Sequence, residues 1–222
     1  MRITYLGHAS FYVEGGGVRV AVDPWLTGNP RAAVKAEDLK VDYIVLTHAH
    51  DDHKGDVIPI ARANDATVIT TNEIAVWLQE QGVKAHGMHL GGKTPLGDGY
   101  ARCFPAFHGS GIAGGHAAGY VLRLGGKTFY HAGDTCLFSD MKLLNGIVDT
   151  VDVAALPIGD NYTMGPEDAA VAAQWINPRI VIPMHYNTFP LIEVDAGAFK
   201  RRVESESGIR VEILEPGQSL HV

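Results

Sequence analysis

The sequence predicts an α/β protein in which one β-sheet packs on another and helices lie outside, and three observations support this. Strand-like segments first follow one another directly and then alternate with helical segments, and this order occurs twice along the 222 residues. Such an order is typical of layered α/β folds. Apolar residues make up 46% of the chain, enough for a sizeable core. No linker or low-complexity segment interrupts the pattern, so we expect a single domain over residues 1–222.

The first half of the chain opens as a meander of short strands. Residues 2–24 are rich in aromatic and β-branched side chains and are divided by the glycines at 15–17, which predicts strands joined by a tight turn. Residues 41–48 (VDYIVLTH) form a continuous apolar run, which predicts a buried strand. The segments expected next are a helix over 56–64 opened by Asp56 despite Pro59, a strand over 66–71, and a helix over 72–82 with Asn72 as N-cap and Gly82 just past its end.

The second half repeats this order without a close sequence repeat. Residues 84–111 are punctuated by glycines and strand-like, and residues 120–135 form the clearest hairpin, with Gly125 and Gly126 at its turn. The segments expected after the hairpin are a buried strand over 152–159, a helix over 165–176 with Pro166 in its first turn, a strand over 179–186, a helix over 194–207, and a closing strand and tail over 209–222.

Composition excludes several classes of function. The net charge is −7 and no basic run is present, which disfavours a nucleic acid as partner because binding one requires a basic surface. No segment reaches the ~18 consecutive apolar residues that a membrane span requires, and the N-terminus has no signal core. Only two cysteines occur, Cys103 and Cys136, too few for a disulfide framework. We therefore expect a cytoplasmic protein without a membrane span.

A cluster of histidines and aspartates follows the buried strand at 41–48. The motif is HAHDDH at residues 48–53. At a strand end alternate residues share a face, so His48 and His50 can converge on one ion, while Asp52 and His53 follow as the chain turns and can reach a second ion. Imidazole and carboxylate are the ligands that zinc and its neighbours prefer. A solvated turn is the alternative, but independent roles for each member at this spacing are hard to devise.

A site with two metals needs more ligands than these six residues provide. Three candidates follow other predicted strands, namely His108 in FPAFHGSG, Asp134 in FYHAGDT and His185 in IVIPMHYN. Open α/β sheets place their chemistry at the carboxyl ends of strands. Each of these residues alone could be structural, and it is their shared placement that favours a role in the site.

These motifs resemble the metallo-β-lactamase superfamily over nearly the whole chain. The segments YLGHASFYVE, HAGDT and LPIGDNYTMGPEDA are similar to the branch that holds ascorbate-6-phosphate lactonase and N-acyl phosphatidylethanolamine phospholipase D. The similarity is greater still to uncharacterised metal-dependent hydrolases of bacteria and archaea. The resemblance implies an αββα sandwich of two mixed β-sheets flanked by helices, with a two-metal site at the edges of the sheets.

The resemblance also implies a ligand set. His48, His50 and His108 would hold one metal, Asp52, His53 and His185 the other, and Asp134 would bridge them. The cofactors would be two divalent ions, with Zn²⁺ expected first and Mn²⁺, Ni²⁺ or Fe²⁺ compatible with the same ligands. Relatives often self-associate, so a homo-oligomer is compatible with the family.

We predict a metal-dependent hydrolase in which a metal-bridged hydroxide attacks a small ester, lactone or phosphodiester-type substrate. Asp52 would ligate a metal and also steer the proton of the hydroxide, and His8 would act beside it or contact the substrate. Two alternatives are a metal-binding or ligand-sensing module without catalysis and a phosphodiesterase that acts on a nucleotide or lipid head group. An antibiotic-hydrolysing role is disfavoured because the bridging position holds Asp134 and not cysteine. An electron-transfer role is disfavoured because His50 stands where flavodiiron proteins of this fold carry Glu.

The remaining polar residues receive weaker predictions. His131 is expected to be structural or to support a ligand, and Asp51 to accept a hydrogen bond from a ligand histidine. Substrate contact and an ordinary turn are both open for the loop residues that follow strands, which are Asp160, Asn161, Tyr162 and Asn187. Surface or loop positions are expected for the other histidines, His86, His89, His116 and His221, although His116 could belong to a glycine-rich flap.

Overall fold

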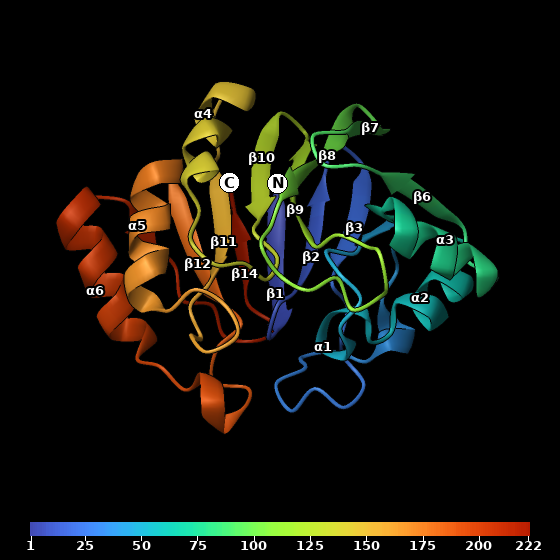
Figure 1. The fold of residues 1–222 in the computed structure, drawn as a ribbon, viewed down its shortest axis with the longest axis horizontal. Helices are drawn as coiled ribbons and strands as arrows, with labels where there is room; N and C mark the ends of the chain where they lie inside the picture. The colour runs from blue at the N-terminus through green and yellow to red at the C-terminus, as the bar shows by residue number, and fades with distance from the viewer.

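Two seven-stranded mixed sheets form the centre of the protein in the computed structural model, which describes residues 1–222 (Figure 1). In spatial order, the first sheet contains β14 (Ser219–His221), β1 (Arg2–Gly7), β2 (Ser10–Gly15), β3 (Val18–Val22), β4 (Tyr43–Val45), β5 (Thr67–Thr71) and β6 (Ala85–Met88). The second contains β13 (Arg210–Val211), β12 (Ile180–Met184), β11 (Val153–Pro157), β10 (Lys127–His131), β9 (Ala118–Leu124), β8 (Gly99–Pro105) and β7 (Lys93–Leu96).

Both sheets change from antiparallel to parallel pairing at a corresponding point. Strands β1 to β3 are antiparallel, and β3 to β6 are parallel. In the second sheet β7 to β10 are antiparallel, and β10 to β13 are parallel. Parallel neighbours need crossover connections, and these carry most of the helices. The exits of the parallel strands lie along one edge of each sheet, as the sequence order predicts.

Helices cover the outer face of each sheet (Figure 1). Helices α2 (Val57–Asn64) and α3 (Asn72–Glu80) lie on the first sheet, and α5 (Pro166–Ile176) and α6 (Ala196–Ser207) lie on the second. The shorter elements are α1 (Asp51–Lys54), α4 (Leu144–Ile147) and the 3-10 helices η1 (Ala36–Asp38), η2 (Ser139–Leu143) and η3 (Pro190–Ile192). The predicted αββα sandwich is confirmed. None of the helices has the length and apolar character needed to cross a bilayer.

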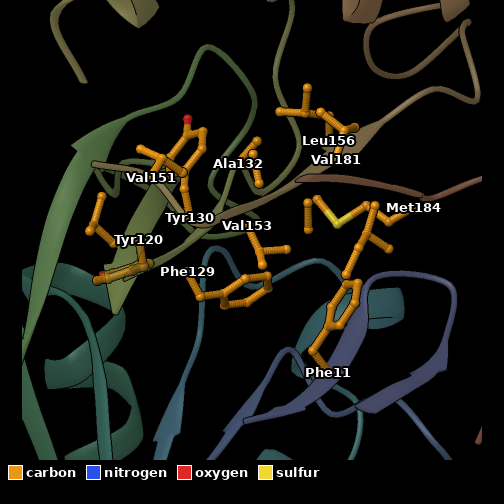
Figure 2. Packing of buried hydrophobic residues seen from close by; sticks show 14 of the residues in the cluster. Phe11, Tyr120, Phe129, Tyr130, Ala132, Val151, Val153, Leu156, Val181 and Met184 are labelled. Carbon is orange, nitrogen blue, oxygen red and sulfur yellow. The ribbon is translucent and has the colours of Figure 1, made fainter. Parts of the chain in front are cut away.

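The main core lies between the two sheets and continues under the helices of the second sheet. Phe11 on β2 meets Phe129 on β10 with ring centroids 5.6 Å apart, and Figure 2 shows these rings among the buried side chains of the second sheet. A separate apolar cluster, which includes Ile44 and Leu78, fills the space between the first sheet and α2 and α3. Burying a side chain such as Phe11 stabilises the fold by roughly 2–3 kcal/mol. The packed sheets give the loops at their edges a rigid support.

At the helix starts, the predicted N-cap Asn72 is wrong, whereas Asp56 does occupy the N-cap position of α2. Helix α3 begins at Asn72 itself and Thr71 occupies the N-cap position, because β5 runs into the helix without a loop. Asp56 precedes α2, but its side chain does not cap that helix; Asp56 Oδ2 instead accepts hydrogen bonds from the backbone N–H groups of Leu26 and Thr27, both at 2.8 Å. Pro59 is tolerated because it lies in the first turn, where a helix does not need the missing N–H.

The closing segment at 209–222 does not form one strand. Arg210–Val211 pair in parallel with β12 of the second sheet, whereas Ser219–His221 pair with β1 of the first. The turn at Gly217, whose φ is +91°, separates the two pieces. Such a division depends on partners distant in sequence, so the local pattern could not reveal it.

Candidate metal centre

The predicted ligands converge where strand ends of both sheets meet. His48 and His50 follow β4, Asp52 and His53 lie on α1, and each of the remaining three follows a strand of the second sheet, namely His108 after β8, Asp134 after β10 and His185 after β12. The backbone N–H of His185 donates to the backbone carbonyl of His8 at 2.8 Å, which joins the two sheets at this point. The structure therefore brings all seven residues to one place.

Asp134 lies at the centre of the cluster. Its Oδ2 lies 3.1 Å from His185 Nε2, 3.5 Å from His108 Nε2 and 3.9 Å from His48 Nε2. Its Oδ1 lies 3.2 Å from His53 Nε2. Two ligand atoms about 2.1 Å from a tetrahedral ion are separated by roughly 3.4 Å, so these spacings suit donors that share an ion.

Two sets of donor atoms that lie within 4.8 Å of one another contain the predicted ligands other than Asp134, and a third joins His48 and His53 to Asp23. One set contains His48, His50 and His108. The other contains Asp52, His53 and His185, together with His8. These sets match the two groups implied by the family resemblance, with His8 as an addition to the second.

Several of these donor atoms are buried without a hydrogen-bond partner. They are Nε2 of His48, Nε2 of His53, Oδ1 of Asp134, and both ring nitrogens of His185. The 3.2 Å approach of His53 to Asp134 lacks the geometry of a hydrogen bond, which is why both atoms remain unpaired. Leaving a buried polar atom unpaired costs about 1–3 kcal/mol. A cation held by these atoms would remove that cost, so the residues present fit a metal centre.

Asp23 was not identified from the sequence, yet it contacts His53 of the second set directly and supports His48 of the first set through Thr47. Asp23 is fully buried after β3, and its Oδ2 lies 2.7 Å from His53 Nδ1. Its carboxylate also accepts hydrogen bonds from the backbone N–H of Thr47 at 2.8 Å and from the Thr47 hydroxyl at 2.6 Å. Because both oxygens are already engaged, Asp23 orients the ligands and does not complete a metal set of its own. The only local signal was an Asp-Pro pair at the end of a strand.

These contacts determine which ring nitrogen faces the cluster. His53 Nδ1–H donates to Asp23, so Nε2 is the ring nitrogen of His53 that points at the cluster. The Thr47 hydroxyl donates its proton to Asp23, so at 3.0 Å it accepts from His48 Nδ1–H. A histidine that ligates a metal through Nε2 needs this kind of support at Nδ1.

Charges in the cluster are strongly coupled. Burial opposes protonation of His185, but Asp134 and Asp52 outweigh it and raise the pKa of His185 to about 9. Burial likewise opposes protonation of His53, yet Asp134 and Asp23 raise its pKa well above the usual range. Burial would raise the pKa of Asp134, but His185 and His53 hold it well below its ordinary value. Without a metal, the cluster therefore balances its carboxylates with protonated histidines, and these protons must leave when a cation binds.

His8 is fully buried beside Asp52 in a left-handed backbone conformation, with φ of +58°. Its Nε2 lies 3.2 Å from Asp52 Oδ2, and its Nδ1 lies 2.9 Å from the Thr188 hydroxyl. Burial lowers the pKa of His8 to about 4, although Asp52 opposes this. A neutral His8 that accepts from Thr188 has Nε2–H available to hold the Asp52 carboxylate in place.

Other predictions for single residues have mixed outcomes. His131 is buried and structural, because Nε2 donates to the backbone carbonyl of Ala9 at 2.9 Å and Nδ1 accepts from Gly133 N–H at 3.1 Å. Asp51 does not support a ligand: its carboxylate is exposed and lies 2.6 Å from Lys54 Nζ. The surface positions expected for the remaining histidines, His86, His89, His116 and His221, agree with their exposure.

A glycine-rich loop packs directly on the HAHDDH motif. Ser110 accepts a backbone hydrogen bond from Ala49 N–H at 2.7 Å. Gly111 has φ of +78°, and a Cβ at this position would lie 2.4 Å from the carbonyl carbon of Ala49. Close approach of backbone to backbone explains why glycine is needed here. His116 belongs to the same loop, but its side chain is exposed and does not line the site.

A cavity of about 250 Å³ opens onto the cluster. It is lined by His50, Asp52, His108, Asp134, Tyr162, His185 and Phe189. Tyr162 thus reaches the site, whereas Asp160 and Asn161 shape the loop that carries it. Asn187 turns the chain, since its Oδ1 accepts from Val194 N–H at 2.8 Å. A larger hollow of about 680 Å³ lies along the loop at 26–38, and no histidine lines it.

The fold is that of a known class of proteins. The family model described as "Beta-lactamase superfamily domain" matches residues 2–185, and the chain therefore belongs to the metallo-β-lactamase superfamily.

Relatives with similar sequences extend over the whole chain. The chain is 53% identical to a UPF0173 metal-dependent hydrolase of Symbiobacterium thermophilum, over 99% of each chain. It is 45% identical to a UPF0173 metal-dependent hydrolase of Pelotomaculum thermopropionicum, over 100% of each chain. Among solved structures it is similar to Igni18, a metallo hydrolase from the archaeon Ignicoccus hospitalis, with a TM-score of 0.93, 39% identity, and coverage of 99% and 97%. The predicted membership of this superfamily is confirmed.

Proposed function

We propose that this protein is a hydrolase that works with two divalent metal ions, in one domain that spans residues 1–222. The observation that carries the proposal is the set of buried, unpaired Nε2 and carboxylate atoms that face one another across the two sheets. An ordinary core would leave so many buried polar atoms unpaired only at a considerable cost in stability. The names of the relatives, metal-dependent hydrolases, agree with this proposal.

Each ion would have its own histidines. His48, His50 and His108 would hold the first, and Asp52, His53 and His185 the second. Asp134 would bridge, because its Oδ1 faces His53 while its Oδ2 faces the other three ring nitrogens. Zinc is the first candidate for both positions, with manganese, nickel and iron compatible with the same donors.

When bound, the metals supply a water of lowered pKa and positive charge that stabilises a developing anion. Asp52 is the protein group best placed to handle the proton of this water, because its side chain is 28% exposed and lines the cavity. His8 positions Asp52 through the 3.2 Å contact at Oδ2. The cavity lining contains no serine or cysteine, which favours a metal-activated water as the nucleophile. Small esters, lactones and phosphodiesters are the substrate classes that this chemistry covers.

Metal content and turnover together test the proposal. The purified protein should retain about two equivalents of metal, and chelation should abolish cleavage of a chromogenic ester, lactone or phosphodiester. Retained metal with no turnover on such a panel would favour a sensing module instead. Failure to retain any metal after loading with zinc or manganese would contradict the proposal.

A further inference from the structure

The wall of the cavity that does not belong to the metal centre is aromatic. Tyr162 and Phe189 are the two lining residues outside the predicted ligand set, and both come from loops of the second sheet. No lysine or arginine lines the cavity. A substrate group that extends away from the metal centre would therefore meet aromatic rings and no cationic side chain.

The loop that carries Tyr162 is held in an unusual backbone conformation. Asp160 and Asn161 both have left-handed backbones, with φ of +59° and +51°. Asp160 Oδ1 accepts from Asn161 N–H at 2.8 Å, and Asp160 N–H donates to the carbonyl of Met164 at 3.0 Å. Consecutive non-glycine residues of this kind carry strain that is often retained at functional sites. The loop presents the Tyr162 ring at the cavity while leaving 53% of the residue exposed.

Phe189, the second aromatic residue of the lining, is held by aromatic contacts. Its ring stacks on Trp25 with centroids 5.8 Å apart and an interplanar angle of 27°. It also meets His8 edge-on at 5.5 Å. Trp25 and His8 belong to the first half of the chain, so Phe189 is fixed by both halves. An aromatic side chain held this way offers a binding surface at a low cost in conformational entropy.

We propose that the substrate is a small, uncharged ester or lactone whose apolar group lies against Tyr162 and Phe189. This inference rests on the proposed function and narrows its substrate class. The faces of aromatic rings carry negative charge density, so they favour an apolar group and disfavour an anionic one. The cavity of about 250 Å³ is smaller than the ~300–1,000 Å³ typical of sites for drug-sized ligands, which favours a compact substrate. A phosphorylated or carboxylate-bearing group would lack a cationic partner beyond the metals.

Binding of simple hydroxamic acids to the zinc-loaded protein tests this without requiring turnover. Acetohydroxamic acid reports whether the metals are available to a chelating head group. Butyrohydroxamic acid and the monohydroxamic acid of succinate then compare an apolar tail with an anionic tail of similar length. We expect calorimetry to show at least about tenfold tighter binding of the apolar member, the effect of burying a short alkyl tail. Rates on p-nitrophenyl butyrate and mono-p-nitrophenyl succinate should show the same preference.

Variants test whether the rings of Tyr162 and Phe189 cause the preference for an apolar tail. Tyr162→Ala and Phe189→Ala should each lower the affinity for butyrohydroxamic acid by roughly fivefold to tenfold and leave the affinity for acetohydroxamic acid unchanged. Tyr162→Phe should bind both as the wild type does, because it keeps the ring and loses only the hydroxyl. The control is Leu191→Ala, which removes an exposed side chain of η3, two residues after Phe189, that does not line the cavity.

The outcomes separate the two proposals. Equal or tighter binding of the anionic tail, with acetohydroxamic acid still bound, would overturn the substrate class and leave the metal-dependent hydrolase intact. Loss of acetohydroxamic acid binding in Tyr162→Ala or Phe189→Ala would show that the rings support the metals and would also overturn it. A zinc-treated protein that retains no metal and binds no hydroxamic acid would overturn the proposed function together with this inference.

Discussion

The two halves of the molecule share one arrangement of strands but contribute different parts of the candidate site. In each half an antiparallel meander leads into parallel strands, and polar residues follow the strand ends. The exit of β4 carries HAHDDH, whereas the corresponding exit of β11 carries the loop with Asp160, Asn161 and Tyr162. The first half thus concentrates candidate metal ligands in one turn, whereas the second contributes single candidate ligands from several strands and the aromatic residues of the cavity wall. Equivalent positions in a repeated topology thus carry candidate metal ligands in one half and aromatic cavity residues in the other.

The largest expected effect is at Asp134, where the two halves meet. Asp134→Ala should remove the carboxylate that faces four ring nitrogens and lower kcat by about a thousandfold or more, with loss of bound metal. Metal content and turnover of the purified variant measure this. Asp51→Ala is the control, because Asp51 lies within the motif but its carboxylate is exposed and pairs with Lys54. Full activity in Asp134→Ala would contradict the shared site.

A smaller effect is expected at Asp23, which supports the ligands of the first half. Asp23→Ala should lower metal affinity about 10–100-fold, because His53 and Thr47 lose the carboxylate that orients them. Competition with a fluorescent chelator gives the dissociation constant. Unchanged affinity would show that the turn at 48–53 is held by packing alone. Asp42→Ala, in a half-exposed ion pair with Arg19 on the same sheet, is the matched control.

The next largest effect is expected at Gly111, whose backbone contacts Ala49 of the first half. Gly111→Ala would force the loop of the second half away from Ala49, and we expect about 2 kcal/mol lower stability together with weaker metal binding. Gly114→Ala in the same loop has a similar φ of +76° but open space around it, so it reports the backbone strain alone. Thermal unfolding of both variants, with and without metal, compares them. Equal losses of stability in Gly111→Ala and Gly114→Ala would mean that the close approach of Gly111 to Ala49 does not matter for stability.

The smallest expected effect, taken per pH unit, is a dependence of stability on pH in the chelator-treated protein. Folding raises the pKa of His185 from its ordinary 6.5 to about 9. Protonated His185 therefore stabilises the metal-free protein fully below pH 6.5, and this contribution is lost as pH rises through 9. Urea unfolding should show stability falling by up to about 1.4 kcal/mol per pH unit over this window. His185→Gln should reduce that slope, and an unchanged slope in the variant would assign it to other groups.

The parts of this molecule that the sequence could predict are those with a local pattern. The layered fold follows from the order of strands and helices. The HAHDDH motif can be recognised because its residues are close together in the chain. The superfamily membership rested on the same motifs. His108, Asp134 and His185 were found by their shared position after strands, and the structure brings them together. Their roles as ligands remain a proposal.

What the sequence could not reveal depends on contacts between distant residues. Asp23 is a single carboxylate whose partners, Thr47 and His53, lie 24 and 30 positions away. Asp56 looked like a helix cap, but its carboxylate accepts a hydrogen bond from the backbone of the loop after β3. The stack of Trp25 on Phe189 joins the two halves, and no local periodicity reports such a pair.

The hydrogen bond from His185 N–H to the carbonyl of His8 allows motion at the site to be measured by hydrogen exchange. Because it is a direct backbone link between the two sheets beside the donor cluster, its amide proton can exchange with solvent only when the sheets separate there or β12 frays. Exchange at this one amide therefore reports how often the site opens. Ligands drawn from both sheets would hold the bond closed, so the rate of exchange should fall when metal binds.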